Sequence, residues 1–559
     1  MTPRSARARP ARGARARPPV APAPRAEAAA VSEEPSRLDR RWWLWLVVAI
    51  GLVAILATYR SYGSNWDEAV QAHYGELAVD YFRSGFIDRR VNRFLNLRFY
   101  GPLVEMIPAL FHGEAKTGAY ELRHLLIPLF GLATLPAVFA YASLARIPGL
   151  PLLATLALAT MPRLYGDWFN NSKDVPFACL FALSMYLLAA LFRARPFTPW
   201  RVLACGLAFG LALDVRPGGL PILAAFFVAA ALLSLTIAHR DVTAARPPVT
   251  TVLLRGAGVF AVAWAVMVLP WPWAHENPLA HPITAMREAA SLGTAYAVLF
   301  EGAVVSSSAL PRHYLLEYLL ITTPPALLAL CVVGTVAGLV RLRHAAAHSF
   351  TFLLTLGWLL LPLMLFTILR PNVYDGIRHF LFVLPAIAIL GAYGASWLCQ
   401  RLAPPRWRAL AMAACAVLLL LPIKDLVALH PYQTTYFNGL VGGVAGADGK
   451  YETEYWLTSY REAIGWVNER AARRPEAIVG LAVAGDGYIT PWVEYYARSN
   501  VRPRIVTAPP EPPSLPDGTD YYIATKRFGF DRGHAAAPVV HTIGRAGAVF
   551  TVIKGRSAP

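Results

Sequence analysis

The chain has 559 residues, of which 56% are hydrophobic and only 15% are charged, whereas about 25% of residues are charged in soluble domains. Several apolar stretches approach or exceed the roughly 20 residues that a helix needs to cross a bilayer. The composition therefore excludes an ordinary soluble domain and predicts a polytopic helical membrane protein.

The net charge of +18 could indicate nucleic-acid binding, but its distribution along the chain favours a membrane protein. Residues 1–41 are rich in Arg, Pro and Ala and lack the apolar side chains needed to fold, so we expect a disordered basic tail. A long apolar run follows without a small-residue cleavage site, so the tail is not a secretory signal peptide. The other basic residues cluster in short loops between apolar runs. We therefore expect no nucleic-acid partner.

Eleven apolar stretches predict membrane spans, of which the third and fifth are short enough to be tilted, kinked or extended into polar loops. The predicted spans are 42–58, 121–144, 150–164, 175–192, 202–214, 219–237, 252–273, 318–340, 350–369, 379–398 and 407–423.

Arginines occupy every second loop, on the side of the basic N-terminus, and the positive-inside rule assigns that side to the cytoplasm. These arginines are Arg146, Arg193, Arg195, Arg201, Arg240, Arg246, Arg341, Arg343, Arg401, Arg406 and Arg408. Because the number of spans is odd, the C-terminus is predicted to lie outside. We expect a multi-pass protein of the cell inner (plasma) membrane with a cytoplasmic N-terminus.

The first outer loop contains an amphipathic pattern at 71–82, which predicts a helix in the membrane interface. Residues 99–111 are apolar but too short to span, and predict a re-entrant or surface helix. After Lys424 the long apolar runs stop. A helix at 460–473 and strands at 477–484, 520–525 and 549–554 predict a small extracytoplasmic α/β domain. The predicted domains are the tail 1–41, a transmembrane domain 42–423 and this α/β domain 424–559.

Two acidic motifs lie where apolar stretches end, both on the predicted outer face. The first is Asn65-Trp66-Asp67-Glu68 and the second is Asn170-Asn171-Ser172-Lys173-Asp174. The acids could simply favour the first turn of a helix. The alternative is that they act as a general base or as metal ligands.

Cationic residues accompany these acids in the same set of loops. Lys173 precedes Asp174, Arg216 follows the fifth span, and Arg378-His379 opens the tenth. Arg216 could merely pair with Asp214, and an Arg at a membrane boundary often snorkels to the interface. Together, however, these side chains are suited to binding a phosphate.

One outer loop also carries potential metal ligands, namely His275, His281, His313 and Glu317. A divalent metal is possible there, but no tight spacing supports one, so we expect no metal site and no cofactor.

A site of carboxylates and cations in the plane of the membrane suits a lipid-linked phosphate substrate. A carboxylate can deprotonate an acceptor hydroxyl or amine. Arg and Lys can stabilise the negative charge that builds up on a departing lipid phosphate. Because nucleotide sugars are not readily supplied outside the cell, a membrane-borne donor is the sensible choice on that face.

The order and sidedness of these motifs resemble those of the GT-C membrane glycosyltransferases, in the branch of the protein mannosyltransferases and the lipid A aminoarabinose transferase (glycosyltransferase family 39-like). The resemblance covers about residues 40–465. The matching motifs are Trp66-Asp67-Glu68, Lys173-Asp174-Val175-Pro176, Arg216-Pro217-Gly218, the run from Arg378 to Pro385, and the segment from His430 to Asn438 followed by Tyr455-Trp456.

The resemblance implies a GT-C-like fold of about 11 transmembrane helices and an inverting transfer of a sugar from a polyprenyl-phosphate donor to a lipid, protein or glycan acceptor. It implies that Asp67 is the catalytic base and that Glu68 and Asp174 shape the acceptor and donor sites. Lys173, Arg216, Arg378 and His379 are the candidates for binding the donor phosphate. This branch is not expected to require a metal.

Two other hypotheses are compatible with the sequence. A transporter or lipid flippase also carries acids in its membrane segments, but here the acids lie at span ends, and no internal repeat is evident. A homologue that has lost its activity and serves as a scaffold is the third hypothesis, although its acidic motifs are intact.

Overall fold

The structure is a computed structural model that describes residues 41–111, 118–193, 198–237, 248–290, 295–342, 346–402, 404–508 and 512–556. The predicted tail 1–41 lies outside the described residues, except for Arg41, which begins the first helix.

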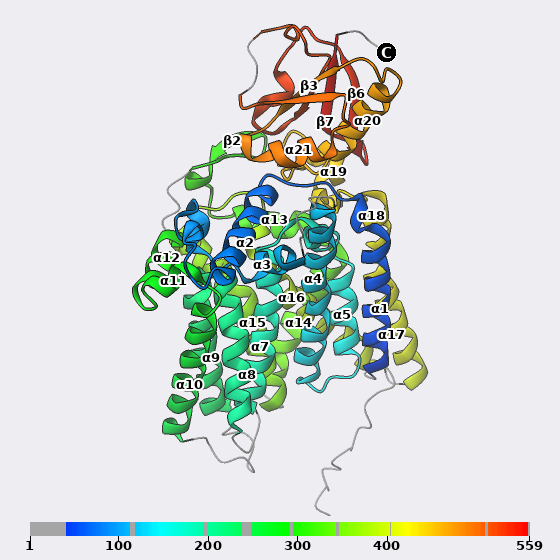
Figure 1. Cartoon of the computed structure of the whole chain (residues 1–559). Coiled ribbons are helices and arrows are strands. Elements are labelled where there is room, and N and C mark those ends of the chain that lie inside the picture. The colour runs from blue at the N-terminus through cyan, green and yellow to red at the C-terminus, as the bar shows by residue number, and fades with distance from the viewer. Residues whose placement is uncertain are drawn as a thin grey trace, which may run out of the picture.

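Long apolar helices form a bundle, and a small sheet domain covers one end of it (Figure 1). All eleven predicted stretches are helical. The bundle helices are α1 (Arg41–Thr58), α4 (Ala119–Ser143), α5 (Leu150–Ala159), α7 (Asp174–Arg193), α8 (Pro199–Val215), α9 (Leu220–Ile237), α10 (Val249–Val268), α13 (Tyr314–Thr322), α14 (Pro325–Arg341), α15 (Ala346–Leu369), α16 (Leu384–Gln400) and α17 (Pro405–Leu420).

Eight helical segments among the described residues are long and apolar enough to cross a membrane, or nine if the pair α13 and α14 forms one bent span. The predicted count of about eleven is higher because it includes α5 and α8, which have only 10 and 17 residues. At 1.5 Å per residue, a helix of 10 residues is about 15 Å long, which is half of the hydrocarbon core.

The eighth predicted span is broken by a bend of 116° between α13 and α14. Pro324 and Pro325 follow Thr323, and a proline disfavours helical geometry in the residue before it. Asn438 satisfies carbonyl groups that the break leaves without helical partners: its Nδ2 donates to the Leu320 and Thr323 oxygens, both at 2.7 Å. A distant segment of the chain thereby stabilises the break.

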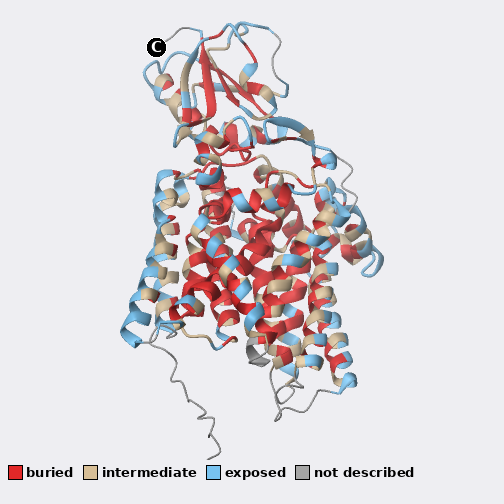
Figure 2. Cartoon of the chain, turned by 180° about the vertical axis from the view of Figure 1, so that it is seen from behind, coloured by how far each residue is buried: buried red, intermediate tan, exposed pale blue. Residues whose placement is uncertain are grey.

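Burial separates the inner helices from the outer ones (Figure 2). In the span that contains α16, 89% of the most apolar stretch is buried within the protein, whereas only 11% is buried in the span of α1. Exposed apolar side chains such as Trp45 and Val53 on α1 would face water in a soluble protein and are expected to face lipid here.

Shorter helices lie at the end of the bundle that faces the sheet domain (Figure 1). The helices predicted at 71–82 and 99–111 are confirmed, as α2 (Glu68–Arg83) and α3 (Leu103–Phe111). The other short helices are α6 (Pro162–Asn170), α11 (Pro272–Glu276), α12 (Ala280–Ala290), α18 (Ile423–Ala428) and α19 (Gly443–Ala447). A hairpin of β1 (Ala297–Phe300) and β2 (Ala303–Ser306) precedes α13.

The C-terminal domain contains a five-stranded sheet in the order β4-β3-β5-β7-β6, with α20 (Tyr460–Ala472) and α21 (Thr490–Tyr496). The strands are β3 (Val479–Ala484), β4 (Val501–Val506), β5 (Tyr521–Thr525), β6 (Val539–Arg545) and β7 (Ala548–Gly555). The predicted helix and three strands are confirmed. The two strands that were not predicted, β4 and β6, are the sheet edges, where charged residues and proline are typical and weaken the strand pattern.

The segment between α17 and α20 contacts both parts of the molecule. Phe437 and Tyr451 belong to the hydrophobic core of the bundle, whereas Tyr432 and Leu457 belong to the core of the sheet domain. The domain boundary predicted at residue 423 falls at the first residue of α18.

Candidate functional site

The two acidic motifs meet at the end of the bundle that carries the sheet domain. Asn65 connects them, because its Nδ2 donates to the Asn170 carbonyl oxygen at 2.6 Å while its Oδ1 accepts the Asp67 backbone N–H at 2.9 Å. Trp66 fixes the next residue by donating from its indole to the Tyr455 oxygen at 2.8 Å. The sequence places Asp67 at the start of α2, and these contacts set its position relative to the second motif.

Asp67 is the most open of the three predicted acids, with 47% of its side chain exposed. Its Oδ2 lies 3.9 Å from Nη1 of Arg378, which is buried. This distance is too long for a hydrogen bond. The carboxylate is therefore accessible while a guanidinium stands next to it.

Aromatic rings and a second acid hold Arg378 in place. The guanidinium carbon lies 4.5 Å from the ring centre of Tyr374 and 4.7 Å from that of Trp456, within the range of cation–π attraction. Its Nε lies 3.3 Å from Oδ2 of Asp375, which is also buried. A buried cation needs such compensation, because removing it from water is costly.

The C-terminal domain contributes to this charge network through Arg527. Its Nη2 lies 2.6 Å from Oδ1 of Asp375, and its Nε lies 3.8 Å from Oε1 of Glu452. Asp375 therefore bridges Arg378 of the bundle and Arg527 of the sheet domain. Neither Arg527 nor Glu452 was among the predicted site residues, because the sequence separation of 152 between Asp375 and Arg527 gives no local signal.

The second acidic motif forms a separate ion pair. Asp174, at the start of α7, pairs with Arg216, which follows α8. Nδ2 of Asn171 also donates to Asp174 Oδ2 at 2.9 Å. The alternative that Arg216 pairs with Asp214 is wrong: Asp214 Oδ2 accepts the Leu103 backbone N–H at 3.3 Å.

The four predicted phosphate ligands lie in one neighbourhood. Lys173 Nζ stands 4.5 Å from the ring centre of Tyr100. Arg378, Arg216 and Lys173 are all close enough to act electrostatically on the His379 imidazole. The ring of Tyr374 contacts both Arg378 and His379 and thereby fixes this region further. The arrangement gathers three cationic side chains around His379, and one of them, Arg378, lies next to Asp67.

Glu68 differs from Asp67 in being enclosed. Its carboxylate lies 3.2 Å from His124 Nε2 and 3.5 Å from Arg123 Nε. Burial alone would raise the pKa of Glu68, but His124 and Arg123 outweigh it and lower the pKa below its ordinary value. Arg123 also binds Glu105 at 2.6 Å. Glu68 thus links the start of α2 to α4, and this link helps to fix the position of the neighbouring Asp67.

Asp167 on α6 is buried beneath the site and accepts the Trp456 indole N–H at 3.3 Å. Burial is the largest cause that raises the pKa of Asp167 to about 7, and Arg163 opposes it. Trp456 links this acid to Arg378, on which its ring packs.

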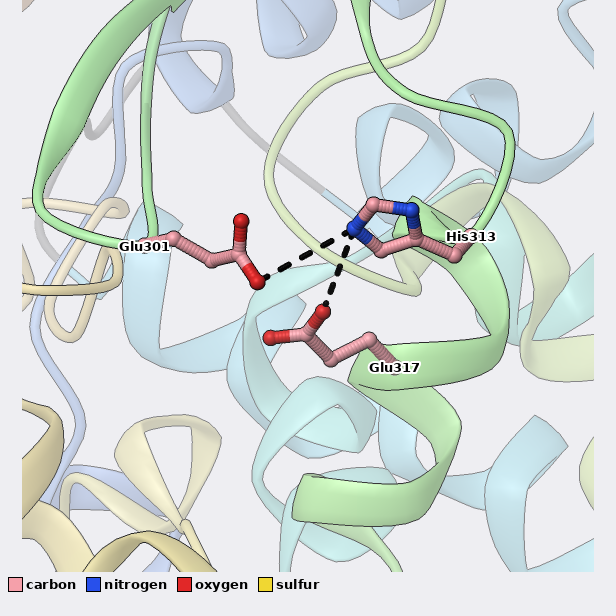
Figure 3. A group of neighbouring side chains, drawn as sticks. All are labelled: Glu301, His313 and Glu317. Carbon is pink, nitrogen blue, oxygen red and sulfur yellow. Dashed lines mark ion pairs between the residues drawn. The ribbon is translucent and has the colours of Figure 1, made fainter.

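The predicted loop histidines do not converge. His275 contacts Tyr81, and His281 stacks on Trp273. His313 and Glu317 do approach each other, and Glu301 joins them (Figure 3). This group of three is the one set of potential metal ligands found among the described residues.

Fold and site together define a polytopic membrane protein in which acids and cations meet at one end of the helix bundle. No protein-family model matches the chain, and no curated protein matches it.

Solved structures do match it. The oligosaccharyltransferase of Archaeoglobus fulgidus in the apo form superposes with a TM-score of 0.51 at 13% identity, over 87% of this chain and 70% of that chain. ArnT from Cupriavidus metallidurans in the apo state gives a TM-score of 0.51 at 14% identity, over 92% of this chain and 98% of that chain. A structure of that ArnT bound to undecaprenyl phosphate gives 0.47 at 15% identity, over the same shares of both chains. The GT-C fold predicted from the motifs is confirmed.

Proposed function

We propose that the chain is an inverting glycosyltransferase that moves a sugar from a polyprenyl-phosphate carrier to an acceptor on the extracytoplasmic face of the membrane. The observation that carries the proposal is the half-exposed Asp67 carboxylate next to Arg378, which belongs to a group of cationic side chains around His379 at the end of a GT-C helix bundle. A base and a phosphate site must be adjacent for direct displacement of a phosphate by a nucleophile.

In this proposal Asp67 accepts the proton of the acceptor hydroxyl or amine. The freed nucleophile attacks the anomeric carbon from the face opposite the phosphate. The bond from that carbon to the phosphate oxygen breaks, and the polyprenyl phosphate leaves with the electron pair. A single displacement of this kind inverts the anomeric configuration.

The leaving phosphate gains negative charge, which fixed cations stabilise more strongly in the transition state than in the bound donor. We assign this role to Lys173, Arg216 and Arg378, and we assign to His379 a hydrogen bond from its ring to the donor phosphate. Asp174 holds Arg216 toward the donor side, and Glu68 fixes α2 so that Asp67 faces the acceptor. The roles of Asp174 and Glu68 agree with their ion pairs, which join Asp174 to Arg216 and Glu68 to Arg123 and His124.

We propose that this step uses no metal ion. The buried carboxylates near Asp67 are already matched by guanidinium groups: Asp174 by Arg216, and Asp375 by Arg378 and Arg527. A divalent cation binds to carboxylates whose negative charge is not already balanced by protein cations.

The proposed orientation follows from the arginine-rich loops. α7 begins at Asp174 in the site and ends at Arg193, about 30 Å away at 1.5 Å per residue. The positive-inside rule assigns the Arg193 end to the cytoplasm. The site and the C-terminal domain are then extracytoplasmic, as in the inner (plasma) membrane of a cell.

The test is donor consumption by the protein in liposomes supplied with several labelled polyprenyl-phosphate sugars and candidate acceptors. We expect Asp67→Asn to lower turnover by about 10²–10⁴-fold, the usual contribution of a general base. Asp80→Asn is the matched control, because Asp80 lies on the same helix and its side chain is 45% exposed; it should keep wild-type turnover.

Wild-type turnover in the Asp67→Asn protein would refute the base assignment. Movement of a labelled lipid between leaflets, without any covalent product, would instead establish the transporter or flippase alternative.

A further inference from the structure

A second group of charged side chains lies at the surface of the protein and does not include Asp67. The hairpin β1–β2 turns at Glu301 and Gly302, whose φ values of 50° and 81° are both left-handed, as in a type I′ turn. The turn places the Glu301 carboxylate opposite the start of α13, where His313 and Glu317 are four residues apart on one helix face. Figure 3 shows the His313 ring directed at both carboxylates.

The distances from His313 to the two carboxylates are longer than a hydrogen bond but short enough for ion pairs. His313 Nε2 lies 3.9 Å from Glu301 Oε1 and 3.6 Å from Glu317 Oε2. All three potential ligand atoms lie within 4.8 Å of one another. Ligands that bind zinc at 2.0–2.2 Å in a tetrahedron are about 3.4 Å apart. Side-chain movements of an ångström or less would therefore close this group around an ion.

The group also carries negative charge that protein cations do not balance. Among the described residues, His313 is the one salt-bridge partner of both Glu301 and Glu317. A histidine in its neutral form leaves two carboxylates facing each other, which is unfavourable without a cation. This contrasts with the Asp67 region, where arginines match the buried acids.

A neighbouring hydroxyl orients one of the ligands. The Tyr451 hydroxyl donates to Glu317 Oε1 at 2.5 Å, which leaves Oε2 directed at His313. Hydrogen bonds of this kind to the outer atom of a ligand are typical of metal sites. His313 and Glu301 are exposed, so an ion can enter from solvent.

We propose that Glu301, His313 and Glu317 form a binding site for a divalent transition-metal ion of the zinc type, with water as the fourth ligand. One imidazole and two carboxylates are a donor set that zinc accepts. The inference does not depend on the proposed transfer reaction.

The ion would clamp the hairpin to α13. The hairpin is already attached on its other side, because the Gly302 backbone N–H donates to the Lys450 oxygen at 2.9 Å. Tyr296, just before β1, packs on Tyr374 with ring centres 4.5 Å apart, and Tyr374 packs on Arg378. A clamped hairpin would therefore hold Tyr296 against the rim of the site that contains Asp67.

The test uses the full-length protein in nanodiscs, with its purification tag removed and its metals stripped by a chelator. After incubation with zinc chloride and desalting, the metal content is measured by mass spectrometry, and the affinity by calorimetry. The visible absorption of Co²⁺-loaded protein reports tetrahedral nitrogen–oxygen ligation. We expect one zinc ion per chain in the wild type.

His313→Ala and Glu301→Gln should each lose this ion, with affinity reduced by more than about tenfold, since even the loss of an outer-shell partner costs 10–100-fold. Tyr451→Phe tests that outer contact and should weaken binding by about tenfold. The matched control is His73→Ala, which removes a surface histidine that pairs with Glu76 at 3.1 Å; this variant should keep the ion.

Two outcomes would overturn the proposal. The first is a wild-type protein that retains no zinc after desalting. The second is zinc binding that survives His313→Ala and Glu301→Gln, since the ion would then lie elsewhere. Tryptophan fluorescence of each metal-free variant shows whether it is folded. If His313→Ala and Glu301→Gln are not folded, the zinc affinity of Tyr451→Phe tests the proposal instead.

Discussion

The bridge from Arg527 through Asp375 to Arg378 predicts that the C-terminal domain stabilises the membrane site. The side chains of Arg527 and Asp375 are only 8% and 3% exposed. Removing one partner of a buried ion pair costs about 3–5 kcal/mol, because the other charge stays buried. In Arg527→Met, Asp375 keeps Arg378 at 3.3 Å. We therefore expect the lower value, a loss of about 3 kcal/mol in the free energy of unfolding.

The measurement is denaturant unfolding in detergent, followed by tryptophan fluorescence, with the transfer rate determined on the same samples. Arg556→Met is the matched control, because Arg556 lies in the same domain and pairs with Asp517 at the surface at 3.5 Å. Surface pairs contribute at most about 1 kcal/mol. The transfer rate should fall in Arg527→Met and not in Arg556→Met.

A double-mutant cycle with Asp375→Asn isolates the pair. The double variant should be more stable than the sum of the two single losses predicts, by about 0.5–3 kcal/mol. Equal losses in Arg527→Met and Arg556→Met, or strictly additive effects in the cycle, would refute the bridge.

Three further predictions concern buried charges. Arg216→Ala should destabilise the protein by about 3 kcal/mol, since Asp174 loses its guanidinium, and should raise the KM for the lipid donor; an unchanged melting temperature and KM would contradict this. The pKa of Glu68 is lowered in the folded protein, so the ionised Glu68 stabilises the fold above its unfolded pKa of about 4.3. This contribution to the free energy of unfolding is lost as the pH falls through the folded pKa. Glu68→Gln should therefore be less stable than wild type at pH 7, and the difference should shrink in acid. The pKa of Asp167 is raised to about 7 in the folded protein, so ionisation of Asp167 destabilises the fold as the pH rises from about 4 to 7. The melting temperature of Asp167→Asn should therefore increase relative to that of wild type over this range. A difference that does not change with pH would contradict this prediction.

The helices were predictable from the sequence because hydropathy is a local property. A run such as 175–192 must be helical in lipid, where every backbone group needs an internal hydrogen bond. Local hydropathy also located α2, whose pattern is amphipathic, and α3, whose apolar stretch is too short to span. It did not show that α13 and α14 form a bent pair, because hydropathy does not register the break at Pro324 and Pro325; Asn438, more than a hundred residues away, further stabilises that break.

The candidate site was partly predictable because charged side chains in an apolar protein are few. Asp67, Asp174, Arg216 and Arg378 stood out for that reason, and the structure brings them into one region. Arg527 did not stand out, because it lies in a polar domain where an arginine is unremarkable.

The sequence by itself determined the membrane class, the helical segments and the end of each helix at which charged residues gather, since these depend on composition and on residues a few positions apart. Only the tertiary structure decided the partners: Arg216 with Asp174 and not Asp214, Arg527 with Asp375, and Glu301 with His313. The physical reason is that an ion pair depends on the distance between two side chains, and helix packing sets that distance between segments far apart in the chain.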